Sequence, residues 1–481
     1  MLFHSVAQYH SQLKNAELSC ADAVQFYLGQ IESSGHLNAF TEVYGQEALS
    51  TAVTLDKKRA AGEPIKKLHG VVIAIKDVIC YKDHRVSAAS NMLKGFESLY
   101  TATALQYLID EEAIIIGSCN CDEFAMGSSN ETSAYGKVLN ALDETKVPGG
   151  SSGGSAVAVQ AGMCMLSLGS DTGGSVRQPA DFCGILGMKP GYGMISRYGL
   201  IAYASSFDQI GIFGNNITDI ALALEVMAKP DPADSTMNAL PPATTFSAFA
   251  SGADQKYRIG FLKQATTRSG IDPEIAEKIN GIKGSLEKAG HEIIEIDFDL
   301  LDHIVPAYYV LTTAEASSNL SRYDGIRFGH RSIMPTEDPE EFYMNNRSEG
   351  FGAEVKRRIM LGTFVLSAGY YDAYYNKAQR IRRLLVDRTD SMFRDIDALI
   401  MPVSPCTAFT AGEKNKDPLA MYLADIYTVF ANLTGIPAMA LPLFTHSNKM
   451  PFGVQVLCNR NEELKMFEVS EMLLQTLNLE P

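Results

Sequence analysis

Short apolar runs, each bounded by glycine or polar residues, recur along the 481-residue chain. Such runs are typical of buried strands, because a strand covered on both faces has no polar side. Four runs predict strands of this kind, and a fifth segment alternates apolar with polar residues and predicts another strand. These five segments are residues 71–75, 114–117, 398–403 and 453–457, with the alternating one at 291–298. The first strand ends at Lys76.

Segments with helical periodicity separate these strands. Ser19 is placed to cap a helix with Val24 on its apolar face. Residues 275–286 repeat Ile and Leu at helical spacing until Gly290 ends the helix. Helices that alternate with short strands predict an α/β fold with a mainly parallel sheet covered on both faces. Residues 231–255 are rich in Pro, Ala, Ser and Thr and predict a long surface connection.

The net charge and the cysteine content limit the classes of function that this chain can have. The formal net charge is −15, which disfavours nucleic-acid binding by this chain, because phosphate contacts need clustered Lys and Arg. The densest basic run, residues 377–388, predicts the solvated face of a helix. Eight scattered cysteines without a Cys-x-x-Cys pair predict free thiols in a reducing, cytoplasmic compartment, and Cys119 with Cys121 lacks the second pair of a metal site. We expect no secretory signal and no membrane span.

Two clusters rich in glycine and serine carry the candidate chemistry, at residues 148–156 and 169–180. A flexible linker is disfavoured because apolar segments flank the clusters, and Ser155 is placed to cap a buried helix. Neither cluster has the Lys-Ser/Thr of a phosphate loop. Residues 149–153 match the Gly-x-Ser-x-Gly nucleophile elbow, but no downstream histidine has a motif-like setting.

Two serines and a lysine supply what amide hydrolysis needs without histidine. Ser175 is the candidate nucleophile, and Ser151 is placed to relay its proton to Lys76. A lysine acts as a base only when neutral, so its pKa has to fall from about 10.4, as burial at a strand end achieves. A salt bridge to Asp77 or to another acidic residue is the alternative role for Lys76. The glycines before Ser175 let backbone N–H groups gather into an oxyanion hole.

These motifs resemble the amidase signature family. The matching segments are Gly-x-x-x-x-x-Lys-Asp at 70–77, Gly-Gly-Ser-Ser-Gly-Gly-Ser at 149–155 and Ser-Asp-Thr-Gly-Gly-Ser-x-Arg-x-Pro-Ala at 170–180. The resemblance implies a Ser-cisSer-Lys triad of Ser175, Ser151 and Lys76. It also implies a single domain over residues 1–481, built on a large mixed sheet sandwiched between helical layers. The implied oxyanion hole comprises the N–H groups of Thr172, Gly173, Gly174 and Ser175, supported by Asp171 and Arg177.

Within that family, four further segments are similar to the glutamine-hydrolysing A subunits of tRNA-dependent amidotransferases. They are residues 122–131, 314–320 together with 322–325, 356–363 and 431–437. This similarity implies a heterotrimer in which ammonia from glutamine passes to a B subunit, with a small C subunit bridging the pair. The B subunit would bind ATP, Mg and Glu-tRNA(Gln) and make Gln-tRNA(Gln), so this chain itself would need no cofactor or metal. A free-standing amidase acting on other amides is the alternative.

The implied glutamine site contains groups of opposite charge. Arg358 can bind the α-carboxylate through its planar guanidinium, and Asp425 can pair with the α-ammonium. Surface pairing is the alternative role for both side chains. Tyr309 would supply a hydroxyl, although Tyr308 could be the matching residue. The predicted substrate-binding residues are Gly127, Ser128, Tyr309, Arg358 and Asp425.

Overall fold

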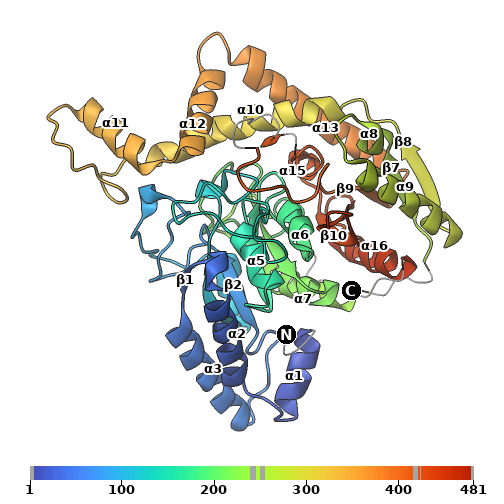
Figure 1. Ribbon diagram of the computed structural model, residues 1–481, viewed down its shortest axis with the longest axis horizontal. Helices are drawn as coiled ribbons and strands as arrows, with labels where there is room; N and C mark the ends of the chain where they lie inside the picture. The colour runs from blue at the N-terminus through green and yellow to red at the C-terminus, as the bar shows by residue number, and fades with distance from the viewer. Residues whose placement is uncertain (1–4, 239–244, 250–254, 415–420, 423, 478–481) are drawn as a thin grey trace.

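A large mixed sheet is the framework of the protein (Figure 1). The computed structural model describes residues 5–238, 245–249, 255–414, 421–422 and 424–477. Within them, eleven strands form one sheet in the order β1-β3-β2-β4-β6-β5-β10-β11-β9-β7-β8. The strands are β1 (Phe40–Val43), β2 (Val72–Lys76), β3 (Ile114–Cys119), β4 (Leu166–Asp171), β5 (Leu186–Lys189), β6 (Gln209–Gly214), β7 (Arg258–Leu262), β8 (Glu292–Ile296), β9 (Ala398–Pro402), β10 (Ala438–Thr445) and β11 (Pro451–Leu457).

Strand direction divides the sheet into three parts. β3, β2 and β4 are parallel neighbours, as are β9, β7 and β8. Every pairing from β4 through β6, β5, β10 and β11 to β9 is antiparallel. The prediction of a mainly parallel sheet from element order is therefore wrong for the centre, where β10 and β11 follow each other as a hairpin. The mixed sheet that the family resemblance implies is confirmed.

Helices cover this sheet. In the described residues they are α1 (Val6–Lys14), α2 (Cys20–Ser33), α3 (Gly45–Ala60), α4 (Thr103–Asp110), α5 (Gly153–Gln160), α6 (Arg177–Cys183), α7 (Ile217–Met227), α8 (Lys263–Thr267), α9 (Pro273–Lys288), α10 (Leu301–Asn319), α11 (Pro339–Gly350), α12 (Ala353–Leu366), α13 (Lys377–Met392), α15 (Val429–Thr434) and α16 (Glu463–Thr476). Figure 1 places α1 to α3 at one end of the molecule and α10, α12 and α13 along the opposite end, where α11 protrudes. α5 packs on β2 and β4, and α6 packs on β5, β10 and β11.

The local sequence signals correspond to observed elements. Ser19 caps α2 and forms a reciprocal capping box with Asp22. The periodic Ile and Leu residues of α9 are buried, and Gly290 beyond its end has a φ of +87°. The basic run lies on α13. Five predicted strands correspond to β2, β3, β8, β9 and β11.

The predicted cap at Ser155 is wrong. α5 begins two residues earlier, at Gly153, and its N-cap residue is Ser152. The small glycines allow the helix to start there, and the Ser155 hydroxyl donates to the Leu168 carbonyl of β4 at 2.9 Å instead. The helix is thereby tied to the strand beside it.

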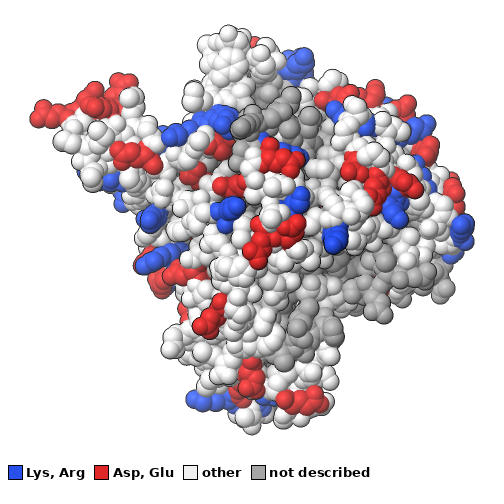
Figure 2. Space-filling model, in the orientation of Figure 1, with Lys and Arg blue, Asp and Glu red and all other residues white. Residues whose placement is uncertain are grey.

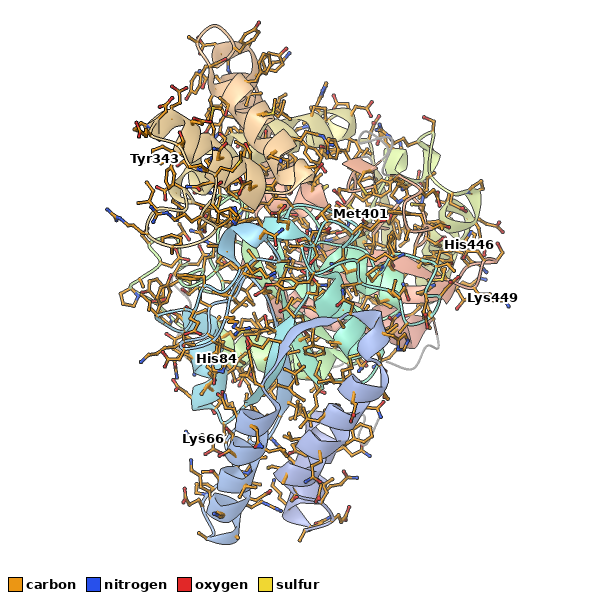
Figure 3. The ribbon with its side chains drawn as sticks, turned by 60° about the vertical axis from the view of Figure 1, so that its left-hand side comes forward. Lys66, His84, Tyr343, Met401, His446 and Lys449 are labelled. Carbon is orange, nitrogen blue, oxygen red and sulfur yellow. The ribbon has the colours of Figure 1, made fainter. Side chains whose placement is uncertain are left out.

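The core follows the central strands. β2, β3, β4, β5, β6 and β9 are buried along their whole length. Figure 3 shows Met401 of β9 inside the molecule, whereas Tyr343 and Lys449 lie at its periphery. Of the predicted connection at 231–255, part lies outside the described residues, and the described part has only a 3-10 turn at Phe246–Ala248. Among the described residues, no helix is long and apolar enough to cross a membrane.

Candidate active site

Lys76 ends β2 in a buried cluster of hydroxyl groups. Its side chain is fully buried, and Nζ donates to Ser151 Oγ at 2.7 Å, Ser152 Oγ at 2.9 Å and Ser170 Oγ at 2.9 Å. Burial penalises the charged ammonium and lowers the lysine pKa to about 8, although nearby acidic groups oppose the shift. A neutral amine is therefore accessible near physiological pH, as a lysine base requires.

Asp77 does not form the alternative salt bridge with Lys76. Its carboxylate accepts the N–H groups of Ser87 and Ala89, both at 2.9 Å, together with the Ser87 hydroxyl. Asp77 therefore fixes the loop after β2, and Lys76 faces the serines.

Backbone contacts on both sides hold Ser151. The peptide bond between Gly150 and Ser151 is cis, as the resemblance implies. The Gly150 N–H donates to Gln178 Oε1 at 3.0 Å, and the Ser151 carbonyl accepts the Asp122 N–H at 3.1 Å. A Cβ atom at Gly150 would lie 2.2 Å from Asp122 Oδ2, so only glycine fits there.

Ser175 is the most accessible of the three predicted catalytic residues. Its exposed fraction is 8%, whereas Lys76 and Ser151 are fully buried. The Ser175 carbonyl accepts the Ser152 N–H at 3.2 Å, which joins the two serine-rich segments. Ser175 is thus the least buried of the three residues, which suits the one that would meet the substrate.

Hydrogen bonds to the Asp171 carboxylate hold the turn that contains Ser175. The Asp171 carboxylate accepts Gly174 N–H at 2.9 Å and Val176 N–H at 3.2 Å. It also pairs with the Arg177 guanidinium, through Nε at 3.1 Å and Nη2 at 3.0 Å. Burial raises the pKa of Asp171, but Arg177, with Lys189 and Asn432, outweighs this effect and brings the pKa down to about 2. The predicted supporting role of this pair agrees with the geometry.

One of the four N–H groups predicted to form the oxyanion hole is already hydrogen-bonded within the protein. The Gly174 N–H is already bound to Asp171, so this prediction needs correction: Gly174 holds the turn instead of facing a substrate. In the described part of the chain, the N–H groups of Thr172, Gly173 and Ser175 make no intramolecular hydrogen bond. A Cβ atom at Gly173 would lie 2.3 Å from Tyr308 Oη, which shows how closely that tyrosine approaches the turn.

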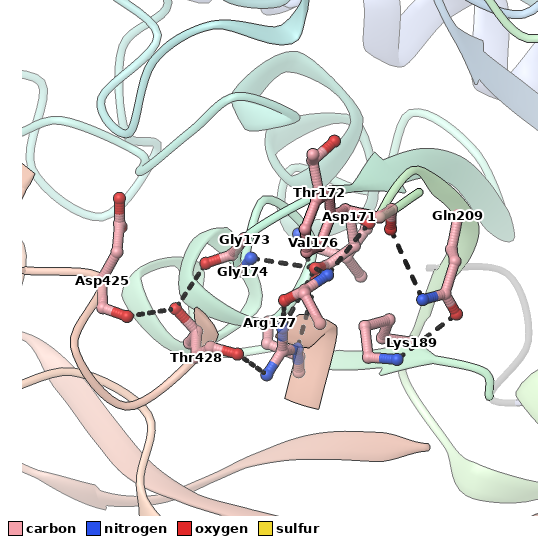
Figure 4. Close-up of polar contacts among 12 residues, drawn as sticks. Asp171, Thr172, Gly173, Gly174, Val176, Arg177, Lys189, Gln209, Asp425 and Thr428 are labelled. Atoms are coloured by element: carbon pink, nitrogen blue, oxygen red, sulfur yellow. Dashed lines mark hydrogen bonds and ion pairs between the residues drawn. The ribbon is translucent and has the colours of Figure 1, made fainter. Parts of the chain in front are cut away.

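Arg177 connects this turn to distant segments (Figure 4). Its Nη1 donates to the Thr428 carbonyl at 2.8 Å and to Gln455 Oε1 at 2.7 Å, and its Nη2 donates to Asn432 Oδ1 at 2.7 Å. Every hydrogen-bonding nitrogen of this fully buried side chain is therefore used. The network locks the serine turn onto the segment that contains Asp425.

A pocket of about 240 Å³ contains several of the predicted substrate-binding residues. Its lining includes Gly127, Ser128, Arg358 and Tyr422. A Cβ atom at Gly127 would lie 2.3 Å from the Asp122 carboxyl carbon, so glycine is required in this wall. A larger open hollow of about 850 Å³ lies elsewhere, beside α1 and α3, and none of the predicted residues lines it.

Asp425 has a buried carboxylate that contacts the pocket residue Ser128, and both of its hydrogen-bond partners are neutral. Its Oδ2 accepts the Ser128 hydroxyl at 2.8 Å and the Tyr309 hydroxyl at 3.1 Å. Burial raises its pKa to about 6, because these hydrogen bonds only partly compensate for desolvation. Tyr309 thus lies with the predicted substrate residues, and Tyr308 lies against Gly173.

Arg358 projects from α12 into a cage of aromatic rings. Its guanidinium lies over the rings of Tyr203, Tyr309 and Tyr422, at 5.5, 5.5 and 5.9 Å from their centroids. Nε donates to Glu354 at 2.8 Å and Nη1 donates to the Tyr203 hydroxyl at 2.9 Å. Arg358 and Asp425 are only 4% and 7% exposed, so neither lies on the surface. Arg358 does form an ion pair, with Glu354 four residues before it on α12, whereas Asp425 forms none among the described residues.

Sequence reasoning missed several residues that complete the site. Ser152 and Ser170 contact Lys76, and their positions inside the two serine-rich clusters were the available signal. Tyr203, Tyr422 and Thr428 carried no local motif. Among the described residues, no group of three or more His, Cys, Asp or Glu side chains is arranged to hold a metal ion.

The buried lysine, the serine hydroxyl groups around it and the large mixed sheet are the features expected of an amidase. The family model for amidases matches residues 22–466. The chain therefore belongs to the amidase family. It is 47% identical, over 99% of its length and 100% of the relative's, to the glutamyl-tRNA(Gln) amidotransferase A subunit from Pelodictyon phaeoclathratiforme.

Two solved structures show that the overall backbone does not distinguish members of this family with different substrates. The crystal structure of the glutamyl-tRNA(Gln) amidotransferase A subunit from Thermotoga maritima is 36% identical and has a TM-score of 0.75, covering 95% of this chain and 94% of its own. The peptide amidase from Stenotrophomonas maltophilia is only 26% identical but has a TM-score of 0.82, with 99% and 97% covered. Because the backbone resembles both, the substrate has to be argued from the pocket residues.

Proposed function

We propose that this chain is the glutamine-hydrolysing subunit of a tRNA-dependent amidotransferase. The observation that carries the proposal is the pair of buried, oppositely charged side chains, Arg358 and Asp425, on either side of Tyr309. Glutamine is a zwitterion, so its site needs a cation for the α-carboxylate and an anion for the α-ammonium. A simple amide substrate needs neither group.

Each charged group retains capacity for a ligand. Among the described residues, no cation forms an ion pair with Asp425, whose two hydrogen bonds come from neutral hydroxyls. The Nη2 atom of Arg358 makes no hydrogen bond in the same set of residues. A bound ammonium would stabilise the ionised form of Asp425, and a carboxylate would accept from the guanidinium.

The proposed chemistry uses the serines and Lys76 in sequence. Ser175 Oγ attacks the side-chain amide carbon of glutamine while its proton passes through Ser151 to neutral Lys76. The N–H groups of Thr172, Gly173 and Ser175 are the candidate donors that stabilise the oxyanion. Lys76 returns the proton through Ser151 to the leaving nitrogen, and ammonia departs. Water then hydrolyses the glutamyl ester, so glutamate is released and Ser175 recovers its proton.

The proposal extends to partners. The named relatives are A subunits, so we propose that B and C subunits complete the enzyme and that the B subunit binds ATP, Mg and Glu-tRNA(Gln). On the face shown in Figure 2, basic residues are interspersed with acidic ones, which suits a subunit that leaves tRNA to a partner. The free thiols of all eight cysteines support a cytoplasmic location.

The test is ammonia release from glutamine by this chain purified with B and C subunits, with and without ATP and Glu-tRNA(Gln). We expect release that rises when both are added and that disappears in the Ser175→Ala variant. Release that ignores tRNA and is equally fast with unrelated amides would contradict the proposal.

A free-standing amidase is the second candidate, because the peptide amidase backbone superposes with the higher TM-score. The Asp425→Asn variant separates the two. It keeps the size of the side chain but removes the negative charge, so the KM for glutamine should rise at least about tenfold, the cost of one charged contact. An unchanged KM for glutamine would favour the second candidate.

A further inference from the structure

Thr428 joins the turn of the nucleophile to the segment that carries Asp425 (Figure 4). Its side chain is fully buried, directly before α15. The Thr428 hydroxyl donates to the Gly173 carbonyl at 2.7 Å, and the Thr428 carbonyl accepts from Arg177 at 2.8 Å. One residue therefore holds the nucleophile turn by both its side chain and its backbone.

Thr428 packs tightly against Gly174. A Cβ atom built on Gly174, whose φ is +123°, would lie 2.2 Å from Thr428 Oγ1 and 2.4 Å from its Cβ. The hydroxyl and the carbon that bears it thus pack directly on the turn. A displacement of Thr428 has to move Gly173 and Gly174 with it.

The peptide unit between Gly173 and Gly174 is held at both ends. Its carbonyl oxygen accepts from Thr428, and its N–H donates to Asp171. These two bonds fix the plane of the peptide. The flanking N–H groups, those of Gly173 and Ser175, are the ones without an intramolecular acceptor in the described residues. The orientation of the oxyanion donors therefore depends on the Thr428 hydroxyl.

Asp425 and Thr428 belong to one tight turn. The Asp425 carbonyl accepts the N–H groups of Thr428 and Val429, both at 3.1 Å. The Thr428 Oγ1 atom also lies 3.1 Å from this carbonyl, but the Gly173 carbonyl, at 2.7 Å, is its nearer acceptor. The carboxylate that is proposed to bind the α-ammonium and the hydroxyl that holds Gly173 are therefore parts of one small rigid unit.

We propose that Thr428 is a positioning residue that makes the oxyanion donors depend on the α-ammonium of the substrate. The inference rests on the proposed function. An ammonium bound to Asp425 fixes the position of the turn from Asp425 to Thr428. The hydrogen bond from the Thr428 hydroxyl to the Gly173 carbonyl then fixes the orientation of the Gly173–Gly174 peptide. The enzyme is then fast with an α-amino acid amide and slow with an otherwise equal amide that lacks the amino group.

The experiment compares two substrates in two matched variants of the complex with its partner subunits. The substrates are L-glutamine and glutaramate, which keeps the amide and the carboxylate but lacks the α-amino group. Thr428→Val removes the hydroxyl and keeps the shape, whereas Thr428→Ser keeps the hydroxyl and loses a methyl. Both kcat and KM are measured, with thermal unfolding as a check on folding.

We expect Thr428→Val to lower kcat for glutamine about tenfold, the cost of one buried hydrogen bond, with little change in KM. The kcat preference for glutamine over glutaramate should shrink by a similar factor, and Thr428→Ser should restore it. A residue that only packs the fold would slow both substrates equally, so an unchanged preference would overturn the inference. If the unaltered complex releases no ammonia from glutamine, the proposed function fails and the inference with it.

Discussion

Two buried lysines end strands of the same sheet, yet their surroundings differ. Lys76 ends β2 and Lys189 ends β5, and both side chains are fully buried. Burial lowers both pKa values, to about 8 for Lys76 and, with the Arg177 charge adding to the effect, to about 7 for Lys189. By pKa alone, Lys189 would be the better candidate for a neutral base.

The hydrogen-bond partners of the two amines tell them apart. Lys76 Nζ contacts three serine hydroxyls, which can both donate and accept, so a proton can move in either direction. Lys189 Nζ donates to the Pro190 carbonyl at 2.7 Å and to Gln209 Oε1 at 3.3 Å, which can only accept. A perturbed pKa therefore does not identify a base unless a proton path reaches it.

The largest expected effect comes from removing each lysine in turn. Lys76→Met should lower kcat for glutamine by about 1000-fold or more, because base and relay are lost together. Lys189→Met, its matched control, should keep kcat within about tenfold, since Lys189 has no hydroxyl partner. Steady-state ammonia release measures kcat in both variants. Similar losses of kcat would contradict the distinction drawn here between Lys76 and Lys189.

The next effect concerns the relay. Ser151→Ala removes the hydroxyl nearest to Lys76 Nζ and should lower kcat at least about 100-fold. Gln209→Met changes the corresponding partner of Lys189 at similar length and should change kcat only a few-fold. If Ser151→Ala kept full activity in the same assay, Ser152 or Ser170 would have to be the relay.

The pH dependence of kcat gives a smaller but sharper distinction. The proposed base Lys76 would act when neutral, so activity should rise about tenfold per pH unit below about 8 and level off above it. The profile should be the same in Lys189→Met, although that residue has the lower pKa. A pH profile with its midpoint near 7 that disappears in Lys189→Met would show that Lys189, and not Lys76, is the titrating base.

The smallest effect concerns stability. Between about pH 7 and 10 the unfolded chain keeps a proton on Lys189 that the folded chain has released, so the free energy of unfolding rises with pH. Below pH 7 both states hold the proton, and the contribution is constant. Lys189→Met should flatten this rise, as urea unfolding at about pH 7 and about pH 9 would show. Lys76 is present in both proteins, so its own contribution cancels, and equal slopes would contradict the assigned pKa.

Much of the fold and of the hydrolytic centre was predictable because the signals are local. The strand before Lys76, the helix capped by Ser19 and the serine-rich clusters each occupy one short segment. The helix start at Ser155 was misplaced because two glycines, poor helix formers, begin α5. The Gly174 N–H was misassigned because its acceptor, Asp171, is set by the winding of the turn.

The motifs alone indicate which residues could do chemistry: a lysine at the end of an apolar strand, serines among glycines, and the family to which these motifs belong. Three-dimensional packing establishes the antiparallel centre of the sheet and the contact of Thr428 with Gly173, 255 residues apart. It also decided that Lys76 and not Lys189 meets hydroxyl groups. Periodicity and motifs report what neighbouring residues require, whereas burial, partners and proton paths depend on which distant segments pack together.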